Sequence, residues 1–225
     1  IMTKPVAKPE TSQSAIALSL SVYFIWGALT LYWKELHGFD PFELIGWRVT
    51  SSVVVLTVVM LATGRLLPLL RLLRNPQLLL RIALASVLLT INWATYVWAV
   101  VNDHVIETAL GYFIAPILTI VVGVFVLHEK LRGIQRVAVS FAVGGIAVLT
   151  VAYGRVPWIA LIIATSWTFY AYLKKKVPLA PLESLTAEVI VLAVPAFIFL
   201  YTTWNNVDSV QNTANSLEWV FVAFT

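Results

Sequence analysis

Apolar residues in this sequence of 225 residues form long stretches that are separated by short polar segments. The stretches do not alternate polar and apolar positions, and each is about twice as long as a membrane β-strand. A helix needs about 20 mostly apolar residues to cross a bilayer. The pattern therefore predicts seven membrane-spanning helices, at residues 14–33, 42–62, 79–101, 108–127, 134–153, 157–173 and 185–204. An eighth helix begins near Leu217.

The composition decides the class of protein. The chain is 60% hydrophobic and 12% charged, with a mean hydropathy of +0.89, whereas soluble domains contain about 25% charged residues. A soluble protein built from buried helices would need far more charge on its surface than these linkers supply. The sequence therefore predicts an all-α polytopic membrane protein. Cysteine is absent, so disulfides play no part.

The basic residues predict how the chain is oriented. If alternate linkers lie on opposite sides of the membrane, twelve Lys and Arg residues fall on one side and two on the other. The basic side of a membrane protein faces the cytoplasm, so residues 1–13 are expected to be a cytoplasmic tail. The net charge of +4 is then a topology signal, and nucleic acid is not an expected partner. The twelve residues are Lys4, Lys8, Arg65, Arg71, Arg74, Arg81, Lys130, Arg132, Arg136, Lys174, Lys175 and Lys176.

Two parts of the chain resemble each other. A shift of 143 residues places 17-ALSLSVYFIWGALTLYWK-34 over 160-ALIIATSWTFYAYLKKKV-177, and a shift of 140 places 41-PFELIGWR-48 over 181-PLESLTAE-188. Five predicted helices precede the second copy, so that copy enters the membrane from the opposite side. Inverted repeats of this kind are used by many secondary transporters, with the substrate site between the copies. We expect a first repeat over 14–153 and a second over 157–225 that stops within its eighth helix.

The segment 92-NWATYVWAVVNDHVIETALGYFIAPILTIVVGVFVLHEKLRGIQRVAV-139 closely resembles the RarD-like branch of the EamA drug/metabolite transporter superfamily, as do 23-YFIWG-27 and 169-FYAYLKKK-176. The resemblance implies ten helices in two inverted five-helix repeats. It also implies a bacterial inner membrane and a small-molecule solute that moves through a central cavity. Branch members are described as chloramphenicol-sensitivity proteins. A ten-helix protein would make this chain part of a longer product. The family block has Asn before its proline, where this chain has Ala115.

The predicted fourth span carries a set of candidate residues: Glu107, Gly111, Tyr112 and Pro116. One interpretation is that Glu107 and Tyr112 border the cavity while Pro116 lets the helix flex. In the other, Glu107 caps the positive helix terminus and Pro116 is tolerated, as prolines in membrane helices often are. Gly111 leads a narrow face that suits close helix packing.

Polar and aromatic residues of other spans are further cavity candidates. Asn92 and Tyr96 share one face of the third span, with Trp93 beside them. Polar groups in hydrocarbon usually face the bundle interior, where they line a solute pocket or form interhelical hydrogen bonds. Four aromatic residues occupy roughly corresponding places in the two copies, where packing or substrate contact would both explain them. These residues are Tyr23, Trp26, Trp167 and Tyr170.

Arg48 is a permanent charge within an apolar span. Seven residues from Pro41 place it roughly 10 Å inside the membrane, and Glu188 lies about as deep from the other side. Arg48 either snorkels to the interface or faces the interior and binds an acidic partner or an anionic substrate group. Glu107 and Glu188 are the candidate carriers if transport is coupled to protons.

The three histidines, His37, His104 and His128, fall in or beside loops on differing sides and predict no metal cluster. No nucleotide-binding or hydrolase motif is present, so no cofactor is expected and transport would be driven by a gradient or run passively. The leading hypothesis is a non-enzymatic secondary transporter that exports small amphipathic metabolites or drugs. A membrane-embedded enzyme acting on lipid or isoprenoid carriers and a non-transporting subunit are the alternatives. Membrane lipid is an expected partner, and a homodimer is a further hypothesis.

Overall fold

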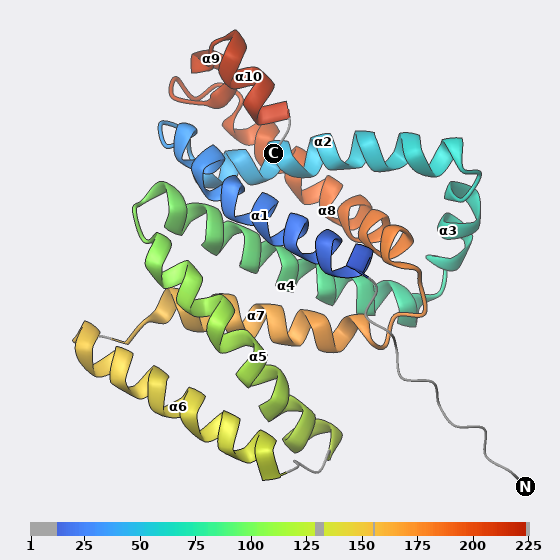
Figure 1. Cartoon of the computed structure of the whole chain (residues 1–225). Coiled ribbons are helices and arrows are strands. Elements are labelled where there is room, and N and C mark those ends of the chain that lie inside the picture. Colours follow the sequence, from blue (N-terminus) through green and yellow to red (C-terminus); the bar gives the residue numbers. More distant parts are fainter. Residues whose placement is uncertain (1–12, 129–132, 155, 224–225) are drawn as a thin grey trace, which may run out of the picture.

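The structure is a computed structural model that describes residues 13–128, 133–154 and 156–223, and this part of the chain is helical without strands (Figure 1). Its elements follow in the order α1 (Gln13–Glu35), α2 (Pro41–Ala62), α3 (Leu66–Leu72), α4 (Pro76–Val101), α5 (Val105–Leu127), α6 (Gly133–Tyr153), α7 (Trp158–Lys174), α8 (Pro181–Thr203), α9 (Val210–Thr213) and α10 (Ser216–Ala223).

The predicted fold class, an all-α membrane protein, is confirmed. Within the described residues, α1, α2, α4, α5 and α8 each have the length and hydropathy to cross a bilayer. Helix α6 has a shorter apolar stretch over Gly133–Val148. Helix α7 has 17 residues, which is shorter than the about 20 residues of a typical span, and it includes Trp, Tyr, Ser and Thr. The short helices α3 and α9 were not predicted, because each lies inside a segment interpreted as a linker.

Proline and a capping side chain set where two long helices begin. The Asp40 carboxylate accepts hydrogen bonds from the backbone N–H groups of Phe42 and Glu43 at 2.9 and 3.0 Å, and Pro41 follows it directly. Asn75 plays the same part before Pro76 at the start of α4. These caps satisfy N–H groups that have no partner within the helix. Both helices are therefore fixed at their first turns.

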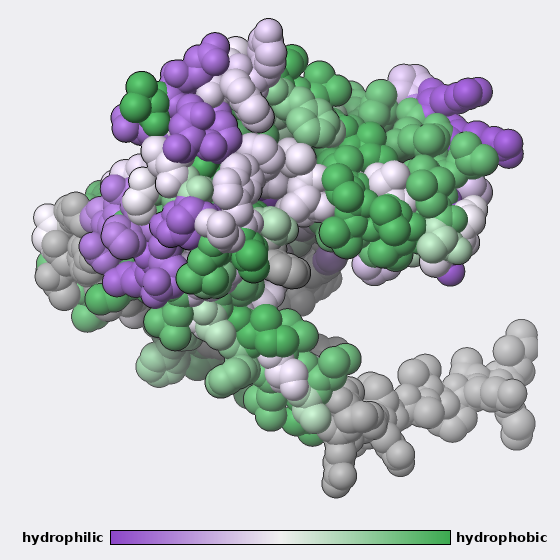
Figure 2. Space-filling view, turned by 90° about the horizontal axis from the view of Figure 1, so that it is seen from above, coloured by the Kyte–Doolittle hydropathy of each residue, from purple (hydrophilic) through white to green (hydrophobic). Residues whose placement is uncertain are grey.

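Hydrophilic residues gather at the two ends of the helix bundle, and hydrophobic residues lie between them (Figure 2). At one end lie α3, the start of α4 and the α7–α8 connection (Figure 1), and we call it the basic end. Arg81 donates a hydrogen bond there to the Lys176 carbonyl at 3.0 Å. At the other end, here called the acidic end, lie Lys34 and Asp103, which form a salt bridge of 3.0 Å. Among the linkers that the structure describes, the predicted basic group and its counterpart therefore occupy opposite ends of the bundle, whereas residues 1–12, 129–132 and 155 lie outside the described residues.

Three helix pairs organise the bundle. Helix α7 packs against α4 and α5, and α2 packs against α8. Helices α2 and α8 run in opposite directions, as do α1 and α7 (Figure 1). The sequence repeat relates these same pairs, so their directions agree with an inverted arrangement. The ten-helix repeat itself stays a prediction.

Small residues allow the closest helix approach. A Cβ atom added at Gly111 on α5 would lie 2.9 Å from the Ile163 Cβ and 3.0 Å from the Ala160 carbonyl oxygen on α7. Ala115, one turn after Gly111, is buried with Ala160 and Ala164 in one cluster. Small residues four positions apart are a common packing surface for membrane helices, because they bring backbones close enough for extensive van der Waals contact. The predicted packing role of Gly111 thus fits its place in the structure.

Candidate functional site

Arg48 lies close to two indole rings. Its guanidinium carbon is 4.3 Å from the centroid of the Trp93 ring and 5.7 Å from that of Trp33. The side chain is half-buried, so it does not simply extend into solvent. Among the described residues, no carboxylate forms an ion pair with it and no acceptor takes a hydrogen bond from its guanidinium. Aromatic faces can hold a cation, but they leave its N–H edges without acceptors.

An aromatic cluster connects the surroundings of Arg48 with the far end of the bundle. The Tyr112 ring contacts the rings of Tyr96, Trp26 and Trp167, with centroids 6.1, 6.3 and 6.4 Å away. Trp167 in turn contacts Tyr170 at 5.7 Å. These distances fall within the range of favourable aromatic pairs. The five rings come from α1, α4, α5 and α7, so the cluster joins helices from both predicted repeats.

Glu188 lies at the other end of the aromatic cluster, and its carboxylate is fully buried. One oxygen accepts from the Lys174 ammonium at 2.7 Å and from the Ser184 hydroxyl at 3.0 Å. The other accepts from the Tyr170 hydroxyl at 2.9 Å. Lys174 also donates to Ser184. A buried charge is stable only when it is paired and its remaining acceptor sites are filled, and this network satisfies both conditions.

The depths of Arg48 and Glu188 in the sequence leave open whether the two interact. Within the described residues, the cation paired with Glu188 is Lys174. Sequence reasoning had assigned Lys174 to the basic connector after the sixth span. It missed Lys174 because a run of three lysines looks like a topology signal, although the first of them is the last residue of α7.

Asn92 and Tyr96 occupy different environments on α4. The Asn92 amide nitrogen donates to the Ile163 carbonyl at 3.0 Å and to the Ser166 hydroxyl at 3.1 Å, which ties α4 to α7. That is the interhelical hydrogen bond that the sequence left as one of two interpretations. The Tyr96 hydroxyl shares a hydrogen bond of 3.0 Å with Thr30 on α1, so the side chain joins the aromatic cluster to the first helix.

Glu107 lies in the first turn of α5 and Pro116 within the helix. The buried Glu107 carboxylate lies 3.3 Å from His104 Nδ1. This position at the acidic end fits the interpretation of a helix-terminal residue. Pro116 is exposed, and α5 continues through it to Leu127. Tyr23 is 72% exposed on α1, so it is not placed with the rings described above.

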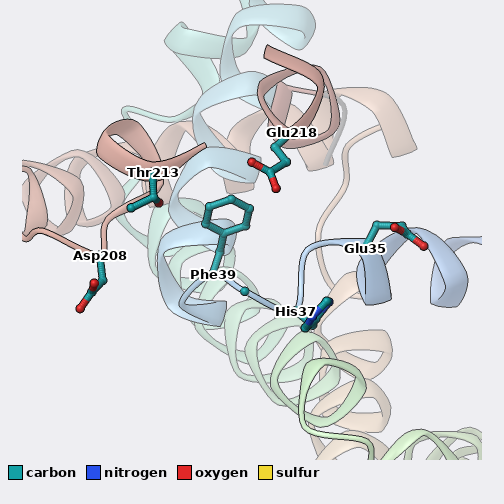
Figure 3. Close-up of a pocket in the computed structure, with 7 residues that line it drawn as sticks. Glu35, His37, Phe39, Asp208, Thr213 and Glu218 are labelled. Carbon is teal, nitrogen blue, oxygen red and sulfur yellow. The ribbon is translucent and has the colours of Figure 1, made fainter. Parts of the chain in front are cut away.

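A separate open pocket of about 430 Å³ lies at the acidic end (Figure 3). Its carboxylates are spread around Phe39 and do not converge on one point (Figure 3). The Glu218 carboxylate accepts a hydrogen bond from the Asn215 N–H at 2.7 Å. Within the described ranges, no three His, Cys, Asp or Glu residues are placed to hold a metal ion. The pocket is lined by Glu35, His37, Gly38, Phe39, Asp208, Thr213 and Glu218.

Comparisons with known proteins place the chain in a family. Residues 13–151 match the model of the EamA-like transporter family. The chain is 40% identical over 190 residues to Protein RarD of Streptomyces exfoliatus, covering 84% of this chain and 60% of that protein. It is 36% identical over 183 residues to an uncharacterised transporter of Pseudomonas aeruginosa, covering 81% of this chain and 61% of that protein. It is 34% identical over 190 residues to Protein RarD of Escherichia coli strain K12, covering 84% and 64%.

The chain thus spans about three fifths of the length of these curated relatives. No solved structure matches it. The family match covers more than half of the chain, and the relatives align over most of it. With its apolar helices, the chain is a multi-pass membrane protein and belongs to the EamA-like transporter family, in the branch that contains RarD.

Proposed function

We propose that this protein is a secondary transporter that exports small amphipathic metabolites or drugs across the bacterial inner membrane. The observation that carries the proposal is the aromatic cluster between Arg48 and Glu188, which α1, α4, α5 and α7 build together. Small-molecule sites combine aromatic walls with a few polar anchors. In transporters built from inverted repeats, such sites lie between the repeats near the middle of the membrane.

The proposed mechanism is alternating access. One repeat would rock against the other, so that the aromatic cluster opens first to one side and then to the other. The N-terminus would face the cytoplasm, because the basic end would be the inner end under the positive-inside rule. The Lys174–Glu188 pair, 2.7 Å long, would then lie on the cytoplasmic side of the cluster and Arg48 nearer the outer side.

The experiment uses bacterial cells with and without the full-length gene, loaded with a panel of labelled amphipathic compounds. Cells that carry the gene should retain less of at least one compound, and that compound should leave unchanged in mass. A Tyr112→Ala variant should lose this export, because it removes the ring that contacts three others. Phe113→Ala is the matched control, since Phe113 is the next residue on α5 and is 76% exposed. Recovery of a chemically altered compound would support the membrane enzyme instead.

Proton coupling is a further part of the proposal. Glu188 is the acid closest to the aromatic cluster, through its hydrogen bond to Tyr170. If it exchanges a proton during transport, export into acidified vesicles should be faster than export without a pH gradient. A Glu188→Gln variant should transport at the same rate with and without the pH gradient. Equal rates with and without the gradient in the unmodified protein would exclude this coupling.

A further inference from the structure

The charge on Arg48 has no counterion in the described part of the chain. Three carboxylates are buried there, and each contacts another group. Glu43 accepts from the Val210 N–H at 2.9 Å, Glu107 lies 3.3 Å from His104, and Glu188 is paired with Lys174 at 2.7 Å. None of them forms an ion pair with Arg48. A charged group in the apolar part of a membrane is expensive, so Arg48 would be stabilised by an anion from elsewhere.

The geometry around Arg48 defines where that anion would bind. The Trp93 ring lies 4.3 Å from the guanidinium carbon and holds the cation from one direction. Arginine presents its N–H donors in the plane of the guanidinium, at its edges, and they match the two oxygens of a carboxylate. Tyr32, Tyr96 and Tyr112 lie in the neighbourhood of the Arg48 charge. The Tyr32 hydroxyl already donates to the Phe221 carbonyl and the Tyr96 hydroxyl is hydrogen-bonded to Thr30, so Tyr112 is the tyrosine whose hydroxyl could donate to a bound carboxylate.

The aromatic cluster defines the rest of the ligand. Tyr96 and Tyr112 belong both to the surroundings of Arg48 and to the cluster. Trp26 and Trp167 continue the apolar surface from Tyr112. An acid with an aromatic or extended apolar body could therefore place its carboxylate at Arg48 and its body against these rings. A small inorganic anion could bind to the Arg48 charge but would make no contact with the rings.

We propose that Arg48 binds the carboxylate of the solute, so that the transported compounds are organic acids with an aromatic or apolar body. This inference rests on the proposed transport function and adds the class of substrate. It gives Arg48 the role of recognising the solute, whereas Lys174 and Glu188 satisfy each other within the protein.

The test uses the purified full-length protein in neutral phosphatidylcholine nanodiscs, with phenylacetate and its neutral counterpart phenylacetamide as probes. Quenching of tryptophan fluorescence reports binding, since Trp33 and Trp93 lie close to the arginine. Phenylacetate should bind about tenfold or more tightly than phenylacetamide, as expected for a charge-assisted bidentate contact. Arg48→Gln should remove this difference, and Arg48→Lys should keep part of it because lysine has the charge without the planar fork. Arg74→Gln, at an exposed arginine, should bind like the unmodified protein.

Equal binding of acid and amide by the unmodified protein, or an undiminished preference in a folded Arg48→Gln variant, would overturn the inference. Displacement of phenylacetate by phosphatidylglycerol, with no transport of the acid, would assign the site to a lipid headgroup and overturn it as well. The failure of the transport function looks different. Arg48-dependent binding without export of any compound would count against transport and leave the carboxylate site in place. Export at an unchanged rate by the Arg48→Gln variant would support the transport function and count against the carboxylate site.

Discussion

Arg48 on α2 and Glu188 on α8 are charged residues at positions that the sequence repeat aligns, yet their surroundings are opposite. Glu188 has a cation at 2.7 Å and two hydroxyl donors. Arg48 has indole rings and nearby phenols, and no acceptor among the described residues. A charge that is satisfied within the protein stabilises the fold, whereas a charge without a partner can bind a ligand. The two aligned positions therefore do not share one role.

The neighbouring helices explain this difference. Helix α7 supplies Lys174 to Glu188 from its last residue. The shift of 143 residues that aligns the two copies places Leu31 of α1 at the position of Lys174. The first copy therefore has no charged residue at the position from which the second copy completes its ion pair. The two copies therefore differ at both members of the pair, because Arg48 stands in place of the acid and Leu31 in place of the lysine.

The largest expected effect is on the paired site. Lys174→Met should lower the free energy of unfolding by about 3–5 kcal/mol, because it leaves the Glu188 carboxylate buried without its cation. Chemical unfolding of the full-length protein in detergent micelles measures this change. The double variant with Glu188→Gln should recover most of the loss, since no buried charge then remains. Lys175→Met, at the exposed next residue, is the control. An equal loss of unfolding free energy in that variant would show that the Lys174–Glu188 pair does not stabilise the protein.

The second largest effect is expected from the close packing of α5 against α7. Gly111→Ala should destabilise the protein by about 1–3 kcal/mol, because overpacking forces helices apart and the added Cβ would meet the Ile163 side chain and the Ala160 backbone. Tyr112 is the adjacent residue, so export should also fall. Gly144→Ala on α6 meets nothing within 4 Å and is the matched control. If both variants behave alike in the same unfolding assay, the close approach of α5 and α7 is unimportant.

Arg48→Gln should change stability far less than Lys174→Met. The variant loses the cation–π contacts, which are worth about 0.5–2 kcal/mol, and it also removes an uncompensated charge from the protein interior. These terms oppose each other, so the midpoint of unfolding should stay close to that of the unmodified protein while binding of phenylacetate is lost. A destabilisation as large as that of Lys174→Met would mean that Arg48 has a structural partner and that the contrast between the two sites is wrong.

The sequence predicted the long helices because apolar runs of this length have few alternatives. All five rings of the aromatic cluster, Trp26, Tyr96, Tyr112, Trp167 and Tyr170, are among the cavity candidates from the sequence, and their contact with a solute stays a prediction. The sequence could not separate them from Tyr23, because helix periodicity does not say which face of α1 meets the other helices. Lys174 was missed because its role depends on the approach of α7 to α8. The same is true of the contact between Glu43 and the Val210 N–H, which joins residues 167 positions apart.

A last prediction uses the Lys34–Asp103 pair, which has the same chemistry as Lys174–Glu188 but lies in solvent. Its atoms are 3.0 Å apart, yet the side chains are 49% and 82% exposed, so water and salt screen their attraction. Lys34 lowers the pKa of the Asp103 carboxyl below its ordinary value of 3.8. Because the folded-state pKa is depressed, any stabilisation is present above that ordinary value and is lost as the pH falls through the folded-state pKa.

Asp103→Asn removes the charge and keeps a residue that tolerates the positive φ of 63° found there. At pH 7 and physiological salt, the variant should unfold at the same denaturant concentration as the unmodified protein, within experimental error. The two proteins should also converge fully in acid, where the carboxyl is protonated. A loss at pH 7 that approaches that of Lys174→Met would show that burial does not distinguish the two ion pairs. The depth of each charge, and not its nominal partner, is expected to decide what it contributes to stability.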